Sequence, residues 1–262
     1  MLRALTFTLI LLGAFMAFDP LSRMIFFPDS YLVGTPRDLG LEYKDVELQV
    51  AGGGRSHGWL IPGPGDETIL WFHGNAGNIS HRLDNIRLLH DLVGASILII
   101  DYGGYGQSDG DPSEARMYAD ARAALRYLRE SGVAPEQTVY FGRSLGSAVA
   151  LELALESPPA RLILETPFES VRAMARTLLP AGLARIVPQR FDNLGRIKRV
   201  HCPVLFIHGD RDEIVPFEQG RALFAAAPEP KSFHIIRGAG HNDTYIVGGE
   251  KYFAAIRKFI AD

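Results

Sequence analysis

Hydrophobic residues along this chain alternate between short dense runs and longer amphipathic stretches. The dense runs are rich in β-branched residues, as in strands buried on both faces. They are Thr68 to His73, Ser96 to Asp101, Thr138 to Phe141, Arg161 to Leu164, Pro203 to His208 and Ser232 to Ile236. Two earlier runs, Asp45 to Val50 and Ser56 to Ile61, flank a Gly-rich turn and predict an opening antiparallel hairpin.

Amphipathic stretches with helical spacing fill the gaps between these runs. They are Ile79 to Val93, Glu114 to Ser131, Leu145 to Glu156, Phe217 to Ala227 and Asp243 to Ile260. Strands that alternate with helices favour a mostly parallel sheet covered on both faces. We therefore expect an α/β fold with an eight-stranded, doubly wound sheet, in one domain that spans residues 24–262.

The longest connection between predicted strands runs from Pro167 to Cys202. Its helical patterns are broken at Pro180 and Pro188. The segment is too short for a large lid domain. We expect a small, mobile cap around residues 168–202.

The N-terminal stretch from Ala4 to Phe18 carries no charge and follows Arg3. Such a pattern directs a chain to a membrane. We expect residues 1–20 to form an uncleaved anchor, with Arg3 on the cytoplasmic side and the folded domain outside the cytoplasm. Two alternatives stay open: a signal that is removed, which leaves a secreted or periplasmic protein, and a helix that packs on a soluble core.

Composition and charge limit the kinds of partner and cofactor that the chain can bind. The net charge is −3, and no Lys/Arg-rich run is interleaved with aromatic residues, which argues against a nucleic-acid partner. Cys202 is the single cysteine, so the chain has neither an intrachain disulfide nor a Cys-rich metal site.

The segment Gly142-Arg143-Ser144-Leu145-Gly146 has the spacing Gly-x-Ser-x-Gly. Alone the string is weak in a chain with 27 glycines, and a glycine-rich connection with an incidental serine is the alternative. Here it follows a predicted strand and precedes a helix, which a nucleophile elbow requires. So tight a turn strains the backbone of Ser144 and leaves no room for a Cβ at Gly142 or Gly146. We expect Ser144 to be a nucleophile.

A serine hydroxyl must pass its proton to a base as it attacks. Of the eight histidines, His241 lies in a loop between the last strand and the last helix, where its ring can reach the elbow. His73 directly follows a strand and is expected to brace the loop after it. The others occupy positions that are more often structural: His57, His81, His90, His201, His208 and His234.

A carboxylate must hold the imidazole in the correct tautomer. We expect Asp212, which follows the seventh strand, to do so, while Asp210 caps its own turn as an Asx-type residue. Glu165, at the end of the sixth strand, remains the alternative acid. The order Ser144, Asp212, His241 is the one that an α/β-hydrolase uses.

An oxyanion that forms during the reaction needs backbone donors. Leu145, after the nucleophile, supplies one. The loop after the third strand supplies the second, from Asn75 or, next in preference, Ala76. A phosphate-binding role for this loop lacks the Lys-Ser/Thr pair. Candidate walls of a substrate pocket, each equally explained as core, are Phe168, Met174, Leu178, Ile186 and Phe217.

Four motifs together resemble the small-capped α/β hydrolases. They are Phe72-His73-Gly74-Asn75-Ala76-Gly77-Asn78, Asp101-Tyr102-Gly103-Gly104-Tyr105-Gly106, Gly142 to Gly146 and His208-Gly209-Asp210-Arg211-Asp212-Glu213-Ile214-Val215-Pro216. The branch is the serine aminopeptidase-like one, which includes bacterial membrane-tethered hydrolases and eukaryotic protein depalmitoylases. The resemblance implies the α/β-hydrolase fold and the hydrolysis of esters or thioesters without a cofactor. Two positions depart from the family pattern: Gly103 replaces an arginine that would brace neighbouring loops, and Ser147 replaces a glycine.

The sequence leaves three functional hypotheses. The first is hydrolysis of an uncharged carboxylic ester through an acyl-enzyme. The second is hydrolysis of a thioester at a membrane, which the anchor and a cationic run favour, although a solvated surface explains that run too. Asp192 is the one acidic residue within this cationic run, which consists of Arg185, Arg190, Arg196, Lys198 and Arg199. The third is a tethered binding module without turnover, which the complete set of Ser144, Asp212 and His241 argues against.

Overall fold

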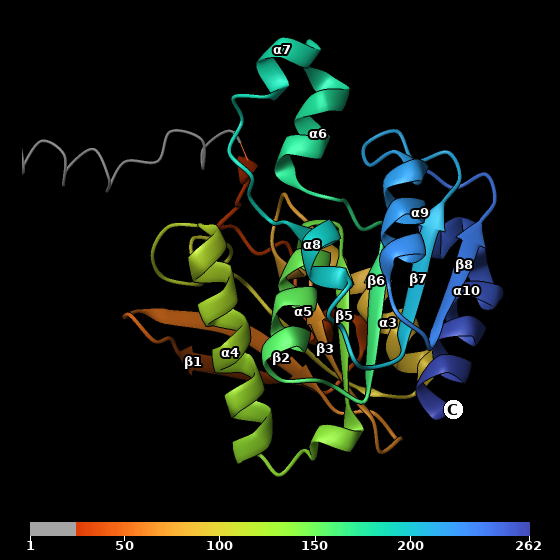
Figure 1. Cartoon of the computed structure of the whole chain (residues 1–262). Coiled ribbons are helices and arrows are strands. Elements are labelled where there is room, and N and C mark those ends of the chain that lie inside the picture. Colours follow the sequence, from red (N-terminus) through yellow and green to blue (C-terminus); the bar gives the residue numbers. More distant parts are fainter. Residues whose placement is uncertain (1–24) are drawn as a thin grey trace, which may run out of the picture.

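One eight-stranded sheet runs through residues 25–262, the part of the chain that this computed structural model describes (Figure 1). The strands are β1 (Lys44–Gln49), β2 (Arg55–Ile61), β3 (Thr68–Phe72), β4 (Ser96–Ile100), β5 (Thr138–Arg143), β6 (Arg161–Glu165), β7 (Val204–Gly209) and β8 (Lys231–Ile236). Their order is β1-β2-β4-β3-β5-β6-β7-β8. Strand β2 runs antiparallel to both of its neighbours, β1 and β4, whereas β3 to β8 run parallel to one another. The predicted sheet is confirmed.

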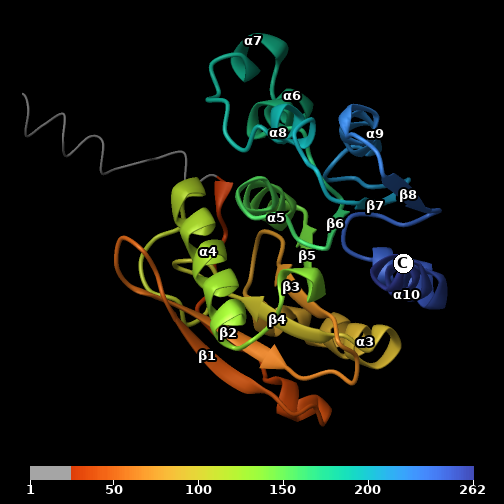
Figure 2. The same ribbon diagram turned by 60° about the horizontal axis from the view of Figure 1, so that its bottom comes forward.

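Helices cover both faces of the sheet (Figure 2). The main ones are α3 (Leu83–Val93), α4 (Glu114–Glu130), α5 (Leu145–Glu156), α9 (Phe217–Ala226) and α10 (Thr244–Ala261). Side chains alternate along a strand, so in β3 Leu70 and Phe72 join the core beneath α4 and α5, whereas Ile69 and Trp71 join the core beneath α3 and α10. The expected α/β fold with helices on both faces is confirmed.

Short 3₁₀ turns complete the chain: η1 (Pro36–Leu39), η2 (Ile79–Arg82) and η3 (Pro135–Gln137). The predicted helix from Ile79 to Val93 therefore begins with a 3₁₀ turn. Its first amides donate to side-chain oxygens: the N–H of Ser80 donates to Asn78 at 2.9 Å, and that of Ile79 donates to Asp101 at 3.0 Å. The spacing of apolar residues does not show that side chains bind these amides, so it did not predict the 3₁₀ turn.

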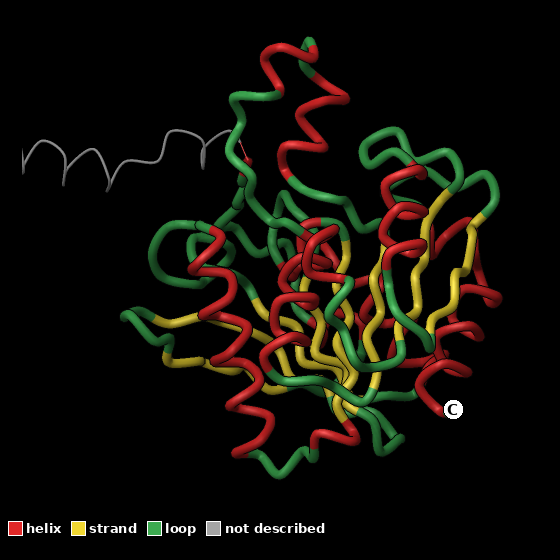
Figure 3. The backbone as a smooth tube through the Cα atoms, in the orientation of Figure 1, coloured by secondary structure: helices red, strands yellow, loops and turns green. Residues whose placement is uncertain are grey.

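The connection between β6 and β7 projects beyond the carboxyl ends of the strands (Figure 3). It contains α6 (Val171–Leu178), α7 (Ala181–Ala184) and α8 (Asn193–Ile197), with Pro180 and Pro188 in the breaks between them. Phe191 closes its base. This ring is fully buried and contacts the rings of Tyr118, Phe168 and Phe26 at centroid distances of 6.1, 6.2 and 6.3 Å.

The expected anchor, residues 1–20, lies outside the described residues. From residue 25 onward, no helix combines the length and apolarity needed to cross a bilayer.

Gly103, where the family pattern has an arginine, lies beneath the side chain of Arg116 from α4. A Cβ added at Gly103 would stand 2.7 Å from Arg116 Cγ. Arg116 pairs with Asp120 at 2.7 Å and donates to the carbonyls of Gly53 and Arg55, each at 3.2 Å. Asp120 also accepts the N–H of Gly103 at 2.8 Å. A cation from α4 therefore occupies the space and braces the neighbouring loops.

We expect Gly103→Arg alone to lower the free energy of unfolding by about 1–3 kcal/mol, because the new side chain and Arg116 compete for one space. Arg116→Ala alone leaves Asp120 buried without its cation and is also destabilising. The double variant is expected to recover part of both losses. Urea unfolding of all four proteins in a double-mutant cycle measures this coupling, and additive effects would contradict it.

Candidate active site

Ser144 stands at the turn between β5 and α5 in a strained backbone conformation, with φ 51° and ψ −117°. The glycines on either side permit this turn. A Cβ at Gly142 would lie 2.4 Å from the carbonyl oxygen of Gly146, and one at Gly146 would lie 2.0 Å from that of Phe72. The expectation that both glycines are needed by close backbone contact is confirmed. The N–H of Ser144 donates to the carbonyl of Glu165 at 2.8 Å, which ties the turn to the end of β6.

His241 lies in the loop between β8 and α10, and its ring reaches the elbow. Its Nε2 is 3.0 Å from Ser144 Oγ, and its Nδ1 is 2.8 Å from Asp212 Oδ2. The ring is nearly buried, with 6% of the residue exposed. The structure therefore brings the three predicted side chains into one hydrogen-bonded line.

Asp212 follows β7 and uses both carboxylate oxygens. Oδ1 accepts the N–H groups of Ile214 and Val215 at 2.9 and 2.7 Å, while Oδ2 faces His241 and lies 3.2 Å from His208 Nε2. Burial alone would raise the pKa of this carboxyl, but hydrogen bonds from His208, His241 and Val215 hold the pKa well below its ordinary value. Asp212 is therefore an anion in the folded protein at neutral pH.

The other two carboxylates considered at this site have different partners. Glu165 is fully buried against Thr244, with the hydroxyl of Tyr252 at 3.2 Å and Nε of Arg143 at 3.5 Å. It does not contact the ring of His241. Asp210 accepts the N–H of Gly238 at 2.6 Å, in the loop that carries His241. The prediction that Asp210 caps its own turn is wrong, because Asp212 Oδ1 already holds the amides there.

Arg143 binds the loop that carries His241, and the sequence analysis did not single it out. Its Nη2 donates to the carbonyl of His241 at 2.8 Å, and its Nε faces Glu165. Glu213 accepts the N–H of His241 at 3.2 Å, so both ends of this residue's backbone are held. Its signal in the sequence was its place in the Gly-x-Ser-x-Gly string, directly before Ser144.

The loop after β3 passes beside Ser144: a Cβ at Gly74 would lie 3.4 Å from Ser144 Cβ. Arg82 Nη2 donates to the carbonyls of Gly74, Asn75 and Ala76 at 3.5, 3.3 and 2.6 Å. In a trans peptide the N–H points opposite to the C=O, so the N–H of Asn75 points away from Arg82.

Donors in this region differ in availability. Among the described residues no acceptor meets the N–H of Asn75, whereas Ala76 donates its N–H to Asn75 Oδ1 at 2.9 Å. Leu145 is the first residue of α5, and its N–H has no acceptor within the helix. The geometry therefore favours Leu145 and Asn75 over Ala76 as a pair of free donors.

A buried cluster of charged and aromatic residues supports this loop from behind. His73 Nδ1 is 2.7 Å from the carbonyl of Gly74, and its Nε2 is 3.5 Å from Asp101 Oδ1. His57 lies between Asp101, at 3.8 Å, and Asp45, at 3.0 Å. Burial alone would lower the pKa of His57, but the two carboxylates raise it above its ordinary value. For Asp101, burial is outweighed by His57 and His73, which lower its pKa.

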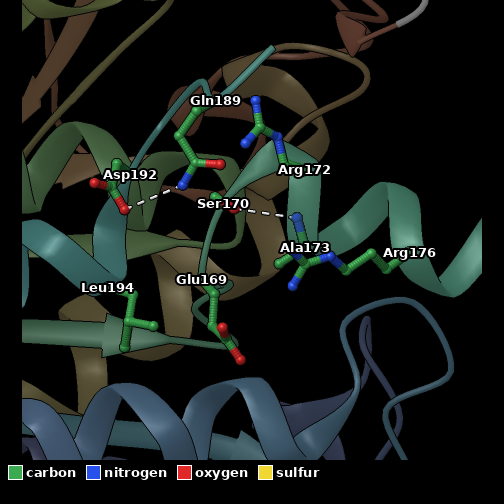
Figure 4. Close-up of a pocket in the computed structure, with 8 residues that line it drawn as sticks. All are labelled: Glu169, Ser170, Arg172, Ala173, Arg176, Gln189, Asp192 and Leu194. Atoms are coloured by element: carbon green, nitrogen blue, oxygen red, sulfur yellow. Dashed lines mark hydrogen bonds between the residues drawn. The ribbon is translucent and has the colours of Figure 1, made fainter. Parts of the chain in front are cut away.

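A cavity of about 280 Å³ lies beneath α6 (Figure 4). Most of the residues that line it have polar or charged side chains: Glu169, Ser170, Arg172, Ala173, Arg176, Gln189, Asp192 and Leu194. The loop that carries Glu169 and Ser170 continues from β6, whose last carbonyl binds the amide of Ser144. The cavity is thus on the same edge of the sheet as Ser144.

None of the five apolar residues predicted to form a pocket lines this cavity. Phe168 is buried in the core against Phe191, and Phe217 packs against His208 with a centroid distance of 5.6 Å. Met174 is half-buried, and its sulfur is 3.4 Å from Gln219. Ile186 is 79% exposed on the outer surface of the connection. The side chain of Leu178 lies outside the described residues.

Comparison with known proteins places these features in a family. The family profile described as "Serine aminopeptidase, S33" (Hydrolase_4) matches residues 63–195, which include the elbow and the loop after β3. An uncharacterized protein of Mycobacterium tuberculosis is 40% identical over 92% of this chain and 87% of its own. Protein bem46 of Schizosaccharomyces pombe is 33% identical over 99% of this chain and 91% of its own.

The fold has solved counterparts. The Pyrococcus furiosus esterase Pf2001 superposes with a TM-score of 0.76 over 90% of this chain and 97% of that chain, at 21% identity. At that identity the likeness concerns the fold. The predicted resemblance to the serine aminopeptidase-like α/β hydrolases is confirmed.

His57 gives this network a testable pH dependence. A pKa raised in the folded state adds stability that is fully present below the unfolded pKa, near 6.5, and is lost as pH rises through the folded pKa. We expect the stability difference between wild type and His57→Gln to be largest near pH 5.5 and to shrink toward pH 8.5. Urea unfolding across this range measures it, with the exposed His201→Gln as the control for loss of an imidazole. A gap that widens with pH would contradict the assignment.

Proposed function

Because the chain belongs to the serine aminopeptidase S33-like family of α/β hydrolases, we propose that it is a serine hydrolase that cleaves carboxylic esters through an acyl-enzyme. One observation carries this proposal. Ser144 Oγ, the two ring nitrogens of His241 and Asp212 Oδ2 form a continuous line with contacts of 3.0 and 2.8 Å. These are the distances at which a base can take a proton from a hydroxyl and a carboxylate can orient that base.

In the first half of the reaction, Ser144 Oγ attacks the ester carbonyl carbon while its proton passes to His241 Nε2. The anion of Asp212 stabilises the imidazolium that forms. The N–H groups of Leu145 and Asn75 bind the oxyanion of the tetrahedral intermediate. Collapse of this intermediate breaks the bond to the alkoxy oxygen, which takes the proton from His241 Nε2 and leaves as the alcohol.

In the second half, His241 accepts a proton from water, and the resulting hydroxide attacks the acyl carbon. The same two amides bind the second oxyanion. The bond to Ser144 Oγ then breaks, Oγ regains a proton from His241, and the carboxylic acid leaves. Arg143 and Glu213 act as positioning residues, because they hold the backbone of His241 while its ring exchanges protons.

A thioester is the second candidate substrate, since the same groups would cleave it with a thiol as leaving group. The observation that favours it is the apolar, cationic outer surface of the connection between β6 and β7, which suits an S-acylated protein presented at a membrane. Matched oxygen and thio esters of increasing acyl length, assayed with the full chain, separate the two: the ratio of their kcat/KM values decides.

We expect Ser144→Ala to lower kcat for a p-nitrophenyl acyl ester by about 10⁴ to 10⁶-fold, because the acyl-enzyme has lost its oxygen. A fluorophosphonate probe should label wild type and not this variant. Ser131→Ala, at the exposed end of α4, is the matched control and should keep both properties. Hydrolysis by Ser144→Ala at the wild-type rate would refute the mechanism.

Asp212→Asn and Glu165→Gln distinguish the two candidate acids. We expect Asp212→Asn to lower kcat by about 10⁴-fold, because the imidazole loses the partner that fixes its tautomer. Glu165→Gln breaks a buried pair with Arg143 and should instead lower the free energy of unfolding by about 3–5 kcal/mol, with a smaller effect on kcat. Steady-state kinetics and urea unfolding of both variants test this. The reverse distribution of effects would transfer the role to Glu165.

A further inference from the structure

Figure 1 shows α7 where the connection between β6 and β7 extends farthest from the sheet. Exposed apolar side chains occur in and beside this helix. Leu179, Leu183 and Ile186 are 41%, 53% and 79% exposed. Backbone bonds from Leu183 to Pro180 and from Ile186 to Leu183 keep this stretch compact. Neighbouring apolar side chains left open to water mark an interaction surface.

The same stretch is exclusively cationic. No aspartate or glutamate occurs between Ser170 and Phe191, whereas Arg176 and Arg185 are exposed there. Arg176 also lines the cavity beneath α6, whereas Arg185 does not. Arg196 does not contribute to this exposed positive charge, since it pairs with Glu152 at 2.7 Å and with Glu114 at 3.1 Å. We define the cap tip as Arg176, Leu179, Leu183, Arg185 and Ile186. Apolar groups flanked by arginines suit the interface of an anionic bilayer.

The start of the described chain lies against the base of the same connection. Phe26 contacts the ring of Phe191 at 6.3 Å, and the next residue, Phe27, is 56% exposed. The uncharged stretch from Ala4 to Phe18 precedes this point by residues 19–24. A fully extended chain of that length spans about 20 Å. A bilayer that holds the apolar stretch must therefore pass close to the cap base.

We propose that the cap tip binds the surface of an anionic phospholipid bilayer, with Leu179, Leu183 and Ile186 among the upper acyl chains and Arg176 and Arg185 at the phosphates. This contact orients the carboxyl edge of the sheet, and Ser144 with it, toward the membrane. The surface goes beyond the proposed hydrolysis and does not rest on it, because none of its five residues contacts the line from Ser144 to Asp212.

The test places a nitrobenzoxadiazole probe on an introduced cysteine in the full chain, reconstituted in phosphatidylcholine vesicles with about 30% phosphatidylglycerol. Cys202 does not interfere, because it is buried and its pKa is raised by burial to about 11. At Ile186→Cys we expect a blue-shifted emission, quenched by lipids brominated along the acyl chain. The control, Glu136→Cys, carries the probe on exposed η3 at the opposite end of the molecule and should show neither effect (Figure 1).

Charge is tested with matched pairs in the labelled chain. Arg176→Gln with Arg185→Gln should reduce the quenching at least twofold at low ionic strength, whereas Lys198→Gln with Arg199→Gln, an equal loss of exposed charge, should not. Thermal unfolding close to wild type shows that each labelled variant is folded.

Three results would overturn the proposal: equal quenching at positions 186 and 136, equal losses for both charge pairs, or no dependence on phosphatidylglycerol. A blue shift that disappears when the protein is diluted within the bilayer would assign the surface to a second copy of the chain, and so would also overturn it.

Discussion

The contact between the amino end of α5 and the end of β3 fixes the geometry of the whole site. At Gly146 a Cβ would stand 2.0 Å from the carbonyl oxygen of Phe72 and 2.6 Å from that of His73, so only a bare backbone fits. The helix therefore begins directly beside the loop that follows β3. The free amides of Leu145 and Asn75 therefore belong to two segments that meet at this contact, and Ser144 lies in the turn that leads into the helix. The positive φ of Ser144, which costs about 1–2 kcal/mol, is a consequence of this approach.

The second requirement is that loops at the carboxyl edge keep their places. Buried charged groups do this here by binding backbone. Arg143 holds the carbonyl of His241, and Arg82 binds three consecutive carbonyls of the loop after β3. Burying charge is costly unless it is paired, and the pairing runs through Glu165 for Arg143 and through His57 and His73 for Asp101. Hydrogen bonds to the backbone, unlike apolar contacts, fix direction as well as distance, which a proton transfer needs.

The sequence predicted the sheet because its signal is local. Runs such as Thr68 to His73 are buried on both faces, and each strand was located within one or two residues. The elbow was equally legible, since Gly142 and Gly146 sit within one short segment. What failed depended on distant partners. Asp210 binds Gly238 across the sheet edge instead of capping its own turn. The sequence analysis also did not single out Arg116, which fills the space above Gly103, or show that Ile186 is 79% exposed. Neither the spacing nor the hydropathy of apolar residues shows which of them are buried in the core and which remain exposed.

The connection between β6 and β7 has two unlike sides. The ring of Phe191 packs its base against the rest of the molecule. Near the end of β6 it lines a cavity with Glu169, Asp192 and Arg176, and at its far end it exposes Leu183 and Ile186 together with Arg185. Phe191 packs on Phe26, Tyr118 and Phe168, which belong to the start of the described residues, to α4 and to the loop after β6. The orientation of the outer surface is therefore set by core packing at its base, whereas the line from Ser144 to Asp212 is set by loops of β5, β7 and β8. Because the two depend on separate contacts, a loss at the outer surface leaves the chemistry of the site intact, and the converse also holds.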